Sequence, residues 1–250
     1  MSVSISLKYN LNSTSDSPRR LLLKVSGEGF SRDGETGLDT ERVKILAEQL
    51  RHLTSNGVQV ACVIGGGNIL RGKQSDTLGI GRATADYMGM LATVINGLAL
   101  CDALEANNVP TRVMSAIDVH KVCEPFIRRR AISHLEKGRV VVLVGGLGSP
   151  YFTTDTASAQ RAIELDCSLL LKATMVDGVY DKDPNKFDDA VCYDNLTFDE
   201  VIDNKLAVMD QTAFTLCREH NLPITVFDMM AENGLVLAAT GKKIGTRIHN

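Results

Sequence analysis

Ser168-Leu-Leu-Leu171 is followed directly by Lys172-Ala-Thr-Met-Val-Asp-Gly-Val-Tyr-Asp-Lys-Asp-Pro184, and this stretch decides the class of fold. The apolar run predicts a buried strand. The segment after it is polar, with a lysine, a threonine and two turns that carry aspartate. In an open α/β sheet, ligands bind outside the carboxyl ends of the strands. The stretch therefore predicts a polar shelf at the carboxyl edge of an α/β sheet.

The rest of the chain alternates strand-like apolar runs with segments of helical period. Strands are predicted at Arg20–Val25, Val58–Ile64, Arg112–Ser115, Arg139–Val144, Pro223–Phe227 and Gly245–Ile248. Helices are predicted from Asp39, over Ala83–Asn107, before Lys137, over Thr156–Leu165, from Thr197 with Glu200 in a capping box, over Asp210–His220 and from Asn233. Residues 181–195 are expected to be rich in turns.

Continuous apolar runs such as Val58–Ile64 are typical of parallel strands that are covered on both faces. The pattern therefore predicts one doubly wound α/β domain over residues 19–250, a three-layer αβα sandwich with a mainly parallel sheet. Residues 1–18 are polar and lack an apolar core, so we expect a flexible tail and neither a signal peptide nor a membrane span.

Composition excludes several classes of function. The 250 residues carry a net charge of −3, which offers no basic face for nucleic acid. The one dense basic run, Arg128–Arg130, is expected to be a solvated helix face. Six cysteines are spread along the chain without close pairs, which favours reduced thiols in a cytoplasm over disulfides or zinc.

Two further glycine-rich segments follow predicted strands. Lys24–Gly29 can be a phosphate-binding loop, although taken alone an ordinary strand exit with a surface lysine explains it better. Gly65-Gly66-Gly67-Asn68 with Arg71 offers free backbone N–H groups and a guanidinium to an anion. The spacing nearly matches a P-loop, but Gln74 stands where Ser or Thr would hold magnesium, so we reject that interpretation.

The third segment, Gly145–Asp155, also follows a central strand and precedes a helix. Its threonines and N–H groups can line an anion or a base, and its alternative role is a connector in which Thr154 or Asp155 caps the helix. Asp86 and Asp210, taken alone, are expected to be caps or solvated carboxylates. The five histidines have no triad or metal spacing, and we assign them no chemistry.

Several anion-competent strand ends, two lysines and several aspartates, without an evident general base, indicate phosphoryl transfer, in which catalysis consists mostly of positioning and charge neutralisation. The combination fits an acceptor that is already ionised. A phosphate monoester, with a second pKa of about 6, is mostly dianionic at neutral pH and needs no base.

Five segments together resemble the bacterial uridylate kinases (UMP kinases) of the amino acid kinase superfamily over about residues 20–248. They are Leu23–Glu28, Val63–Asn68, Asp86–Gly97, Phe152–Asp155 and Lys172–Pro184. The resemblance implies the amino acid kinase fold and the reaction UMP + ATP → UDP + ADP in pyrimidine nucleotide biosynthesis. It also implies Mg²⁺ carried with ATP, feedback inhibition by UTP, a cytoplasmic homohexamer with the helix after Asp86 in subunit contacts, and no need for nucleic acid or membrane.

The resemblance also implies roles for individual residues. The catalytic residues are expected to be Lys24 and Lys172, with Asp155 orienting the lysine. The residues expected to bind ATP are Lys24, Val25, Ser26, Gly27, Gly67, Arg71, Thr174, Tyr180, Asp183 and Asp210. The residues expected to bind UMP are Gly66, Asp86, Leu147, Gly148, Ser149, Pro150, Tyr151, Phe152, Thr153 and Thr154. No protein ligand to a metal is assigned.

The sequence departs from its relatives at several positions. Leu147 and Ser149 stand where many relatives have Thr and Asn, and Met175 where many have Lys or Asn. Cys101 and Glu105 take the places of an Arg and a His through which many members bind the activator GTP, and a carboxylate there repels a triphosphate. Two alternatives stay open: a related kinase with a carboxylate or carbamate acceptor, and a nucleotide-binding regulator without catalysis.

Overall fold

The computed structural model describes residues 20–32, 34–70, 79–184 and 186–250. The tail predicted at residues 1–18 and the anion contact predicted for Arg71 lie outside the described residues.

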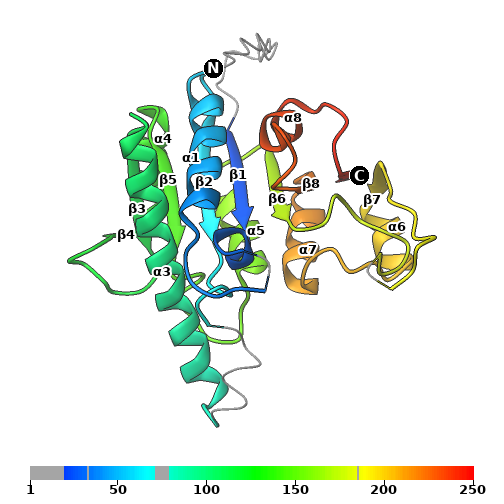
Figure 1. The fold of residues 1–250 in the computed structure, drawn as a ribbon, viewed down its shortest axis with the longest axis horizontal. Coiled ribbons are helices and arrows are strands. Elements are labelled where there is room, and N and C mark those ends of the chain that lie inside the picture. The colour runs from blue at the N-terminus through cyan, green and yellow to red at the C-terminus, as the bar shows by residue number, and fades with distance from the viewer. Residues whose placement is uncertain (1–19, 33, 71–78, 185) are drawn as a thin grey trace.

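Within the described ranges, nine strands form one sheet in the order β4-β3-β5-β2-β1-β6-β8-β9-β7 (Figure 1). The strands are β1 (Arg20–Val25), β2 (Gln59–Ile64), β3 (Thr111–Ser115), β4 (Glu124–Pro125), β5 (Val140–Val144), β6 (Leu169–Thr174), β7 (Asn195–Thr197), β8 (Ile224–Asp228) and β9 (Thr246–His249). All neighbours are parallel except β8 and β9. The mainly parallel sheet confirms the predicted fold class.

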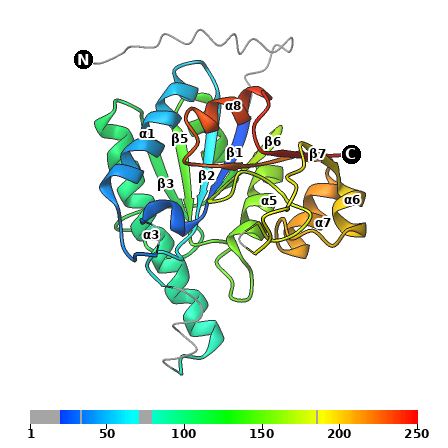
Figure 2. The same ribbon diagram turned by 45° about the vertical axis from the view of Figure 1, so that its right-hand side comes forward.

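Helices cover both faces of this sheet (Figures 1 and 2). One face is packed by α1 (Thr40–Thr54), α3 (Arg82–Ala106) and α8 (Gly234–Thr240) around side chains such as Leu21 and Leu23. The other is packed by α4 (Arg128–Glu136), α5 (Thr154–Glu164), α6 (Phe198–Asp203) and α7 (Gln211–Glu219) around side chains such as Leu22 and Leu170. A short 3₁₀ turn, η1 (Gly27–Phe30), follows β1. The two cores on opposite faces of the sheet account for the continuous apolar strands.

Helix α3 passes the sheet and stands beyond its carboxyl edge with its first turns (Figure 1). It is long and apolar enough to cross a membrane by length and composition, and 44% of its most apolar stretch is buried. Here it packs on β3 and β5, with Leu100 and Leu104 fully buried, as the core helix of an α/β sheet.

Some boundaries differ from the sequence prediction. Strand β6 continues to Thr174, so Lys172 is a strand residue and not the first residue after the strand. Helix α5 begins at Thr154 with Thr153 as its N-cap, which corrects the expectation that Thr154 or Asp155 caps it. Two short strands, β4 and β7, were not predicted. The capping box of Thr197 and Glu200 is confirmed.

The structure also agrees with the predictions for the arginine run, the cysteines and the turn-rich segment. Arg128, Arg129 and Arg130 form a solvated face of α4, as expected. All six cysteines are free thiols, which agrees with the absence of a disulfide pattern. The turn-rich segment after Tyr180 folds back on itself, with an isolated antiparallel bridge between Tyr180 and Cys192.

Candidate active site

The glycine-rich segments predicted to bind ligand lie close together because of the order of the strands in the sheet. Strands β5, β2, β1 and β6 are consecutive neighbours in the sheet and all are parallel. Their carboxyl ends therefore open at one edge, where ligands of such sheets bind. The segments after all four strands, Gly145–Asp155, Gly65–Asn68, Ser26–Gly29 and Met175–Pro184, meet at that edge.

Two lysines and one aspartate form the charged centre of this edge. Lys24 on β1 lies opposite Lys172 on β6 in the parallel register, so both side chains leave the sheet on the same face. Asp155, in the first turn of α5, forms ion pairs with both ammonium groups. Lys24 Nζ lies 2.9 Å from Oδ1, and Lys172 Nζ donates a hydrogen bond to Oδ2 at 2.7 Å. The three side chains are only 10–15% exposed. Lys172 also donates to the Val208 carbonyl at 2.5 Å.

Burial and charge act in opposite directions on Asp155. Burial alone raises the pKa of a carboxyl group, but the ammonium groups of Lys24 and Lys172 outweigh burial and lower the pKa of Asp155 below its ordinary value. Burial is also the largest influence on Lys172, and it lowers the pKa of that ammonium group although Asp155 opposes the shift. Asp155 is therefore ionised at neutral pH and holds two positive charges close together.

The start of α5 is tied to α7 by Asp210. The Thr153 hydroxyl accepts the N–H groups of Asp155 and Thr156 and donates to Asp210. Thr156 donates to the same carboxylate at 3.0 Å. Asp210 also accepts the Ala213 N–H at 2.9 Å and so caps α7, as the sequence predicted. The capping bonds fix the backbone that carries Asp155.

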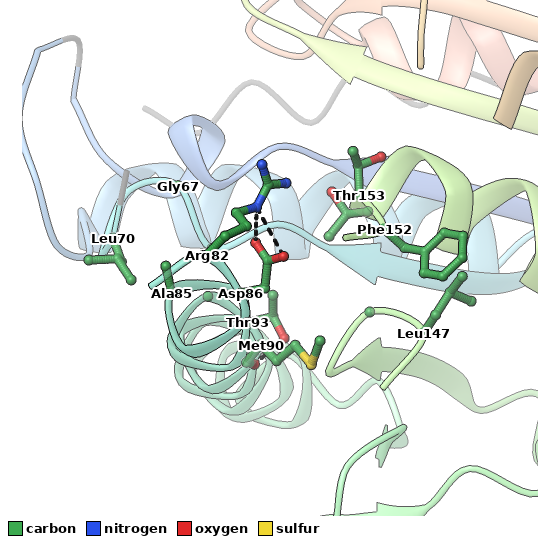
Figure 3. A pocket seen from close by; sticks show the side chains of 14 residues that line it. Gly67, Leu70, Arg82, Ala85, Asp86, Met90, Thr93, Leu147, Phe152 and Thr153 are labelled. Carbon is green, nitrogen blue, oxygen red and sulfur yellow. Dashed lines mark hydrogen bonds and ion pairs between the residues drawn. The ribbon is translucent and has the colours of Figure 1, made fainter. Parts of the chain in front are cut away.

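A cavity of about 320 Å³ opens beside this centre. Figure 3 shows it between α3, the glycine turn after β2 and the loop that leads into α5. Among the residues predicted to bind ligand, it is lined by Gly66, Gly67, Asp86, Leu147, Phe152, Thr153 and Thr154. The lining does not include Gly148, Ser149, Pro150 or Tyr151 from the same predicted segment.

Asp86 lies in α3, one turn after its start, and its carboxylate is only 20% exposed. This corrects the expectation of a helix cap or a solvated carboxylate. It accepts two bonds from Arg82 Nε, at 2.9 and 3.0 Å, and the Tyr151 N–H at 2.7 Å (Figure 3). Arg82 is a cavity residue that the sequence analysis missed. The helix was predicted to begin at Ala83, so the spacing of four between Arg82 and Asp86 was not recognised as a pair on one helix face.

Glycines at this edge stand where no side chain fits. A Cβ on Gly27 would lie 2.3 Å from the Gly67 nitrogen, and one on Gly66 would lie 2.8 Å from the Gly89 carbonyl oxygen. The turns after β1 and β2 therefore contact each other through backbone, and the second also packs on α3. Their N–H groups stay close to the edge at which an anion can bind.

The remaining residues predicted for ATP lie on the segment after β6. The Thr174 hydroxyl donates to the Val176 carbonyl at 2.7 Å, and Asp183 forms an ion pair with Lys186 at 3.2 Å. The Tyr180 hydroxyl donates to Asp177 at 2.5 Å, and this bond raises the pKa of the phenol to about 12. Val25 is fully buried in the core, so only its backbone can contact a ligand. Ser26 is partly exposed at the strand end.

A doubly wound sheet with two lysines bridged by an aspartate at its carboxyl edge is an arrangement suited to phosphoryl transfer. The chain belongs to the amino acid kinase family, which it matches over residues 19–228. It is 52% identical to the uridylate kinase of Acinetobacter baylyi over 236 residues, 93% of this chain and 98% of that protein. It is 50% identical to the uridylate kinase of Dichelobacter nodosus, covering 92% of this chain and 96% of that protein.

Solved structures give the same result. The crystal structure of UMP kinase from Ureaplasma parvum superposes with a TM-score of 0.89 at 38% identity, covering 94% of this chain and all of that one. UMP kinase from Bacillus anthracis superposes with the same TM-score and identity, covering 93% and 97%. Both confirm the αβα fold that the resemblance implied.

Proposed function

We propose that this protein is a nucleoside monophosphate kinase that transfers the γ-phosphoryl group of ATP to UMP and yields UDP and ADP. The observation that carries the proposal is the ion-paired cluster of Lys24, Asp155 and Lys172 at the carboxyl edge, beside a cavity that contains Asp86. The names of the relatives with about half of their residues identical support the choice of UMP as acceptor.

The reaction requires charge neutralisation more than proton transfer. A UMP phosphate oxygen forms a bond to the γ-phosphorus while the bond to the β,γ-bridging oxygen breaks, and ADP leaves with that electron pair. The acceptor phosphate is dianionic at neutral pH, so no base is needed. Lys24 and Lys172 neutralise charge on the transferred group. Asp155 holds the two ammonium groups side by side against their mutual repulsion.

The predicted contacts divide between the two nucleotides. The turn after β1 (Ser26 and Gly27) and the segment after β6 (Thr174, Tyr180 and Asp183) take ATP in this proposal. Gly66 and the loop that leads into α5 take UMP, and Asp86 holds the ribose hydroxyls of UMP. Since Arg82 and the Tyr151 N–H already occupy Asp86, the ribose competes with Arg82 for the carboxylate. Asp210 acts on ATP through α5, which it anchors by Thr153 and Thr156.

Magnesium is proposed only as the companion of ATP. Within the residues that the structure describes, no three His, Cys, Asp or Glu side chains are grouped to hold a metal ion. Both carboxylates near the centre are engaged, Asp155 by lysines and Asp210 by hydroxyl and N–H donors. Mg²⁺ would therefore bind the phosphates of ATP and add to the neutralisation of their charge.

We further propose a homohexamer in which α3 forms subunit contacts. Five large apolar side chains of this helix are 36–49% exposed: Tyr87, Met88, Leu91, Ile95 and Leu98. Such a stripe on an exposed helix face is typical of a surface that another protein copy covers. The cytoplasmic location, feedback inhibition by UTP and a single domain over residues 19–250 are further parts of the proposal.

GTP is not expected to activate this protein. Cys101 and Glu105 line a separate hollow of about 470 Å³ between α3, β3 and β4. The Glu105 carboxylate lies 3.4 Å from Arg112, and Arg112 also faces Glu124 at 3.8 Å. A cation that is already paired with two carboxylates is a poor partner for a triphosphate.

The alternatives from the sequence are not favoured. An acceptor with a carboxylate or carbamate group has no ribose for Asp86 to bind, and the relatives named above are uridylate kinases. A regulator that only binds nucleotide does not need two lysines, Lys24 and Lys172, paired with one aspartate, Asp155.

Product analysis tests the proposal. Incubation of the protein with MgATP and UMP is expected to form UDP and ADP in equal amounts, as resolved by anion-exchange chromatography. ADP without UDP would show hydrolysis instead of transfer and would contradict the proposal.

A further inference from the structure

Two asparagines that have no part in the proposed chemistry form a buried pair under the glycine turns. Asn68 lies in the turn after β2, and Asn96 lies on the inner face of α3; both residues are 0% exposed. Asn96 Nδ2 donates to Asn68 Oδ1 at 2.7 Å, and Asn68 Nδ2 donates to Asn96 Oδ1 at 3.0 Å. The two amides therefore bind each other reciprocally.

The remaining hydrogen of each amide holds a backbone carbonyl. Asn96 donates to the Gly65 carbonyl at 2.8 Å, and Asn68 donates to the Gly37 carbonyl at 2.7 Å. The Gly37 N–H in turn donates to the Asn68 carbonyl at 2.8 Å. Donors and acceptors of both amides are thus satisfied without water, and such complete buried networks fix one geometry.

This pair touches both glycine turns at once. A Cβ on Gly27 would lie 2.8 Å from Asn68 Oδ1 and 2.8 Å from the Asn68 nitrogen, so the turn after β1 rests directly on Asn68. Through Gly65, Asn96 fixes the turn after β2 to α3. In the proposed function the first turn carries the phosphates of ATP and the second lies at UMP.

We propose that Asn68 and Asn96 are positioning residues. They set the distance between the turn after β1, which carries the ATP phosphates, and the turn after β2, which lies at UMP. The inference rests on the proposed phosphoryl transfer, since it assigns the two turns to the two nucleotides. Neither asparagine touches a substrate in this account. Their role is to keep the reacting oxygen and the γ-phosphorus in line, and small errors of position there are costly in rate.

The variant Asn96→Ser tests the role. Each turn still binds its own nucleotide, so the KM values for ATP and UMP should each change by less than about threefold. The kcat should fall on the order of 100-fold, because the two turns are no longer held at a fixed distance from each other. Thr111→Val is the matched control: it removes a buried hydroxyl at the start of β3, which donates to the Val109 carbonyl just before that strand. It is expected to lower Tm without a loss in kcat.

The outcomes separate the two claims. No UDP from the parent protein would contradict the proposed function itself. UDP from the parent, with a kcat of Asn96→Ser equal to that of Thr111→Val at a similar Tm, would overturn the positioning role and leave the proposed function intact. If Asn96→Ser does not fold, Asn68→Ser leaves α3 unchanged and carries the same expectation and the same contradicting result.

Discussion

Asp155 is paired with two ammonium groups, and this ratio of one negative to two positive charges determines the net charge of the site. One carboxylate leaves a net positive charge when it neutralises one of two lysines, and that charge faces the edge where phosphate groups would bind. Low exposure strengthens the effect because little water screens the charges. In the proposed reaction, the cluster therefore stabilises negative charge at the transferred phosphoryl group.

Replacement of Lys24 tests this assignment. Lys24→Met keeps the apolar stem of the side chain and removes one of the two charges, so we expect kcat for UDP formation to fall on the order of 10²–10³-fold. Lys137→Met, on an exposed lysine after α4, is the control and should leave the rate unchanged. A Lys24→Met protein that is as fast as the parent would remove Lys24 from the catalytic residues.

Replacement of Asp155 tests the electrostatics through stability. Asp155→Asn leaves two lysines in a poorly solvated place without their counterion, which should lower the free energy of unfolding at pH 7 by about 3–5 kcal/mol. Because the pKa of Asp155 is lowered in the fold, its contribution is present above the ordinary value of 3.8 and is lost as the pH falls through the lowered value. Urea unfolding of parent and variant measures the difference, which should shrink below pH 3.8. A difference that grows on acidification would contradict the lowered pKa.

At the scale of the elements, the site is made of strand ends that the glycine pattern identifies. Gly65–Gly67 and Gly145–Gly148 could be predicted because glycine clusters after apolar strands have few other uses. Strand β6 was predicted too short because Lys172 and Thr174 interrupt the apolar run, yet only alternate residues need to be buried there. The N-cap of α5 was misplaced by one or two residues because Thr153, Thr154 and Asp155 are all good caps and only geometry selects one.

Contacts between distant segments could not be predicted. The sequence offers no signal that the Tyr151 N–H reaches Asp86 or that Thr153 reaches Asp210, since these bonds depend on how the loop before α5 closes. Strand β4 has only two residues and no period of its own. Arg82 was missed for a local reason: the helix was predicted from Ala83, one residue too late to include the pair that Arg82 forms with Asp86.

The contact of the second glycine turn with α3 leads to a prediction at this scale. In Gly66→Ala the new Cβ would lie 2.8 Å from the Gly89 carbonyl oxygen and 2.9 Å from Ala92 Cβ, so the turn must move away from the helix. We expect the KM for UMP to rise about 10-fold or more while the KM for ATP changes less. Gly81→Ala adds a Cβ in open space and serves as the control. An unchanged KM for UMP would show that this turn does not lie at the acceptor.

At the scale of the whole molecule, α3 joins the site to the outer surface. Its inner face carries Asp86, Thr93 and Asn96, where the Thr93 hydroxyl accepts the Gly145 N–H at 2.7 Å. Its outer face carries the exposed apolar stripe of Tyr87 to Leu98. If copies of the chain cover the outer face, as proposed, both faces of α3 are in contact with protein, which accounts for a sequence that is apolar over almost its full length.

Mutation of the stripe tests whether copies of the chain cover it. Leu91→Asp removes an apolar side chain that is 49% exposed and places a charge at the centre of the stripe, so we expect the proposed hexamer to be replaced by smaller species. Burial of one such side chain contributes about 2 kcal/mol at each contact, before the cost of a buried charge is added. Light scattering coupled to size exclusion measures the mass. Leu38→Asp, on another exposed leucine, is the control. A Leu91→Asp mass equal to that of the parent would place the interface elsewhere.

The most direct test of the central claim is the choice of acceptor. ADP release from MgATP should be measured with UMP, CMP, dUMP, acetylglutamate and aspartate, each with and without GTP. The account predicts rapid release with UMP, none with either carboxylate acceptor, and no change on addition of GTP. Release with acetylglutamate or aspartate but not with UMP would contradict it, and so would tight ATP binding without turnover on any of the five acceptors.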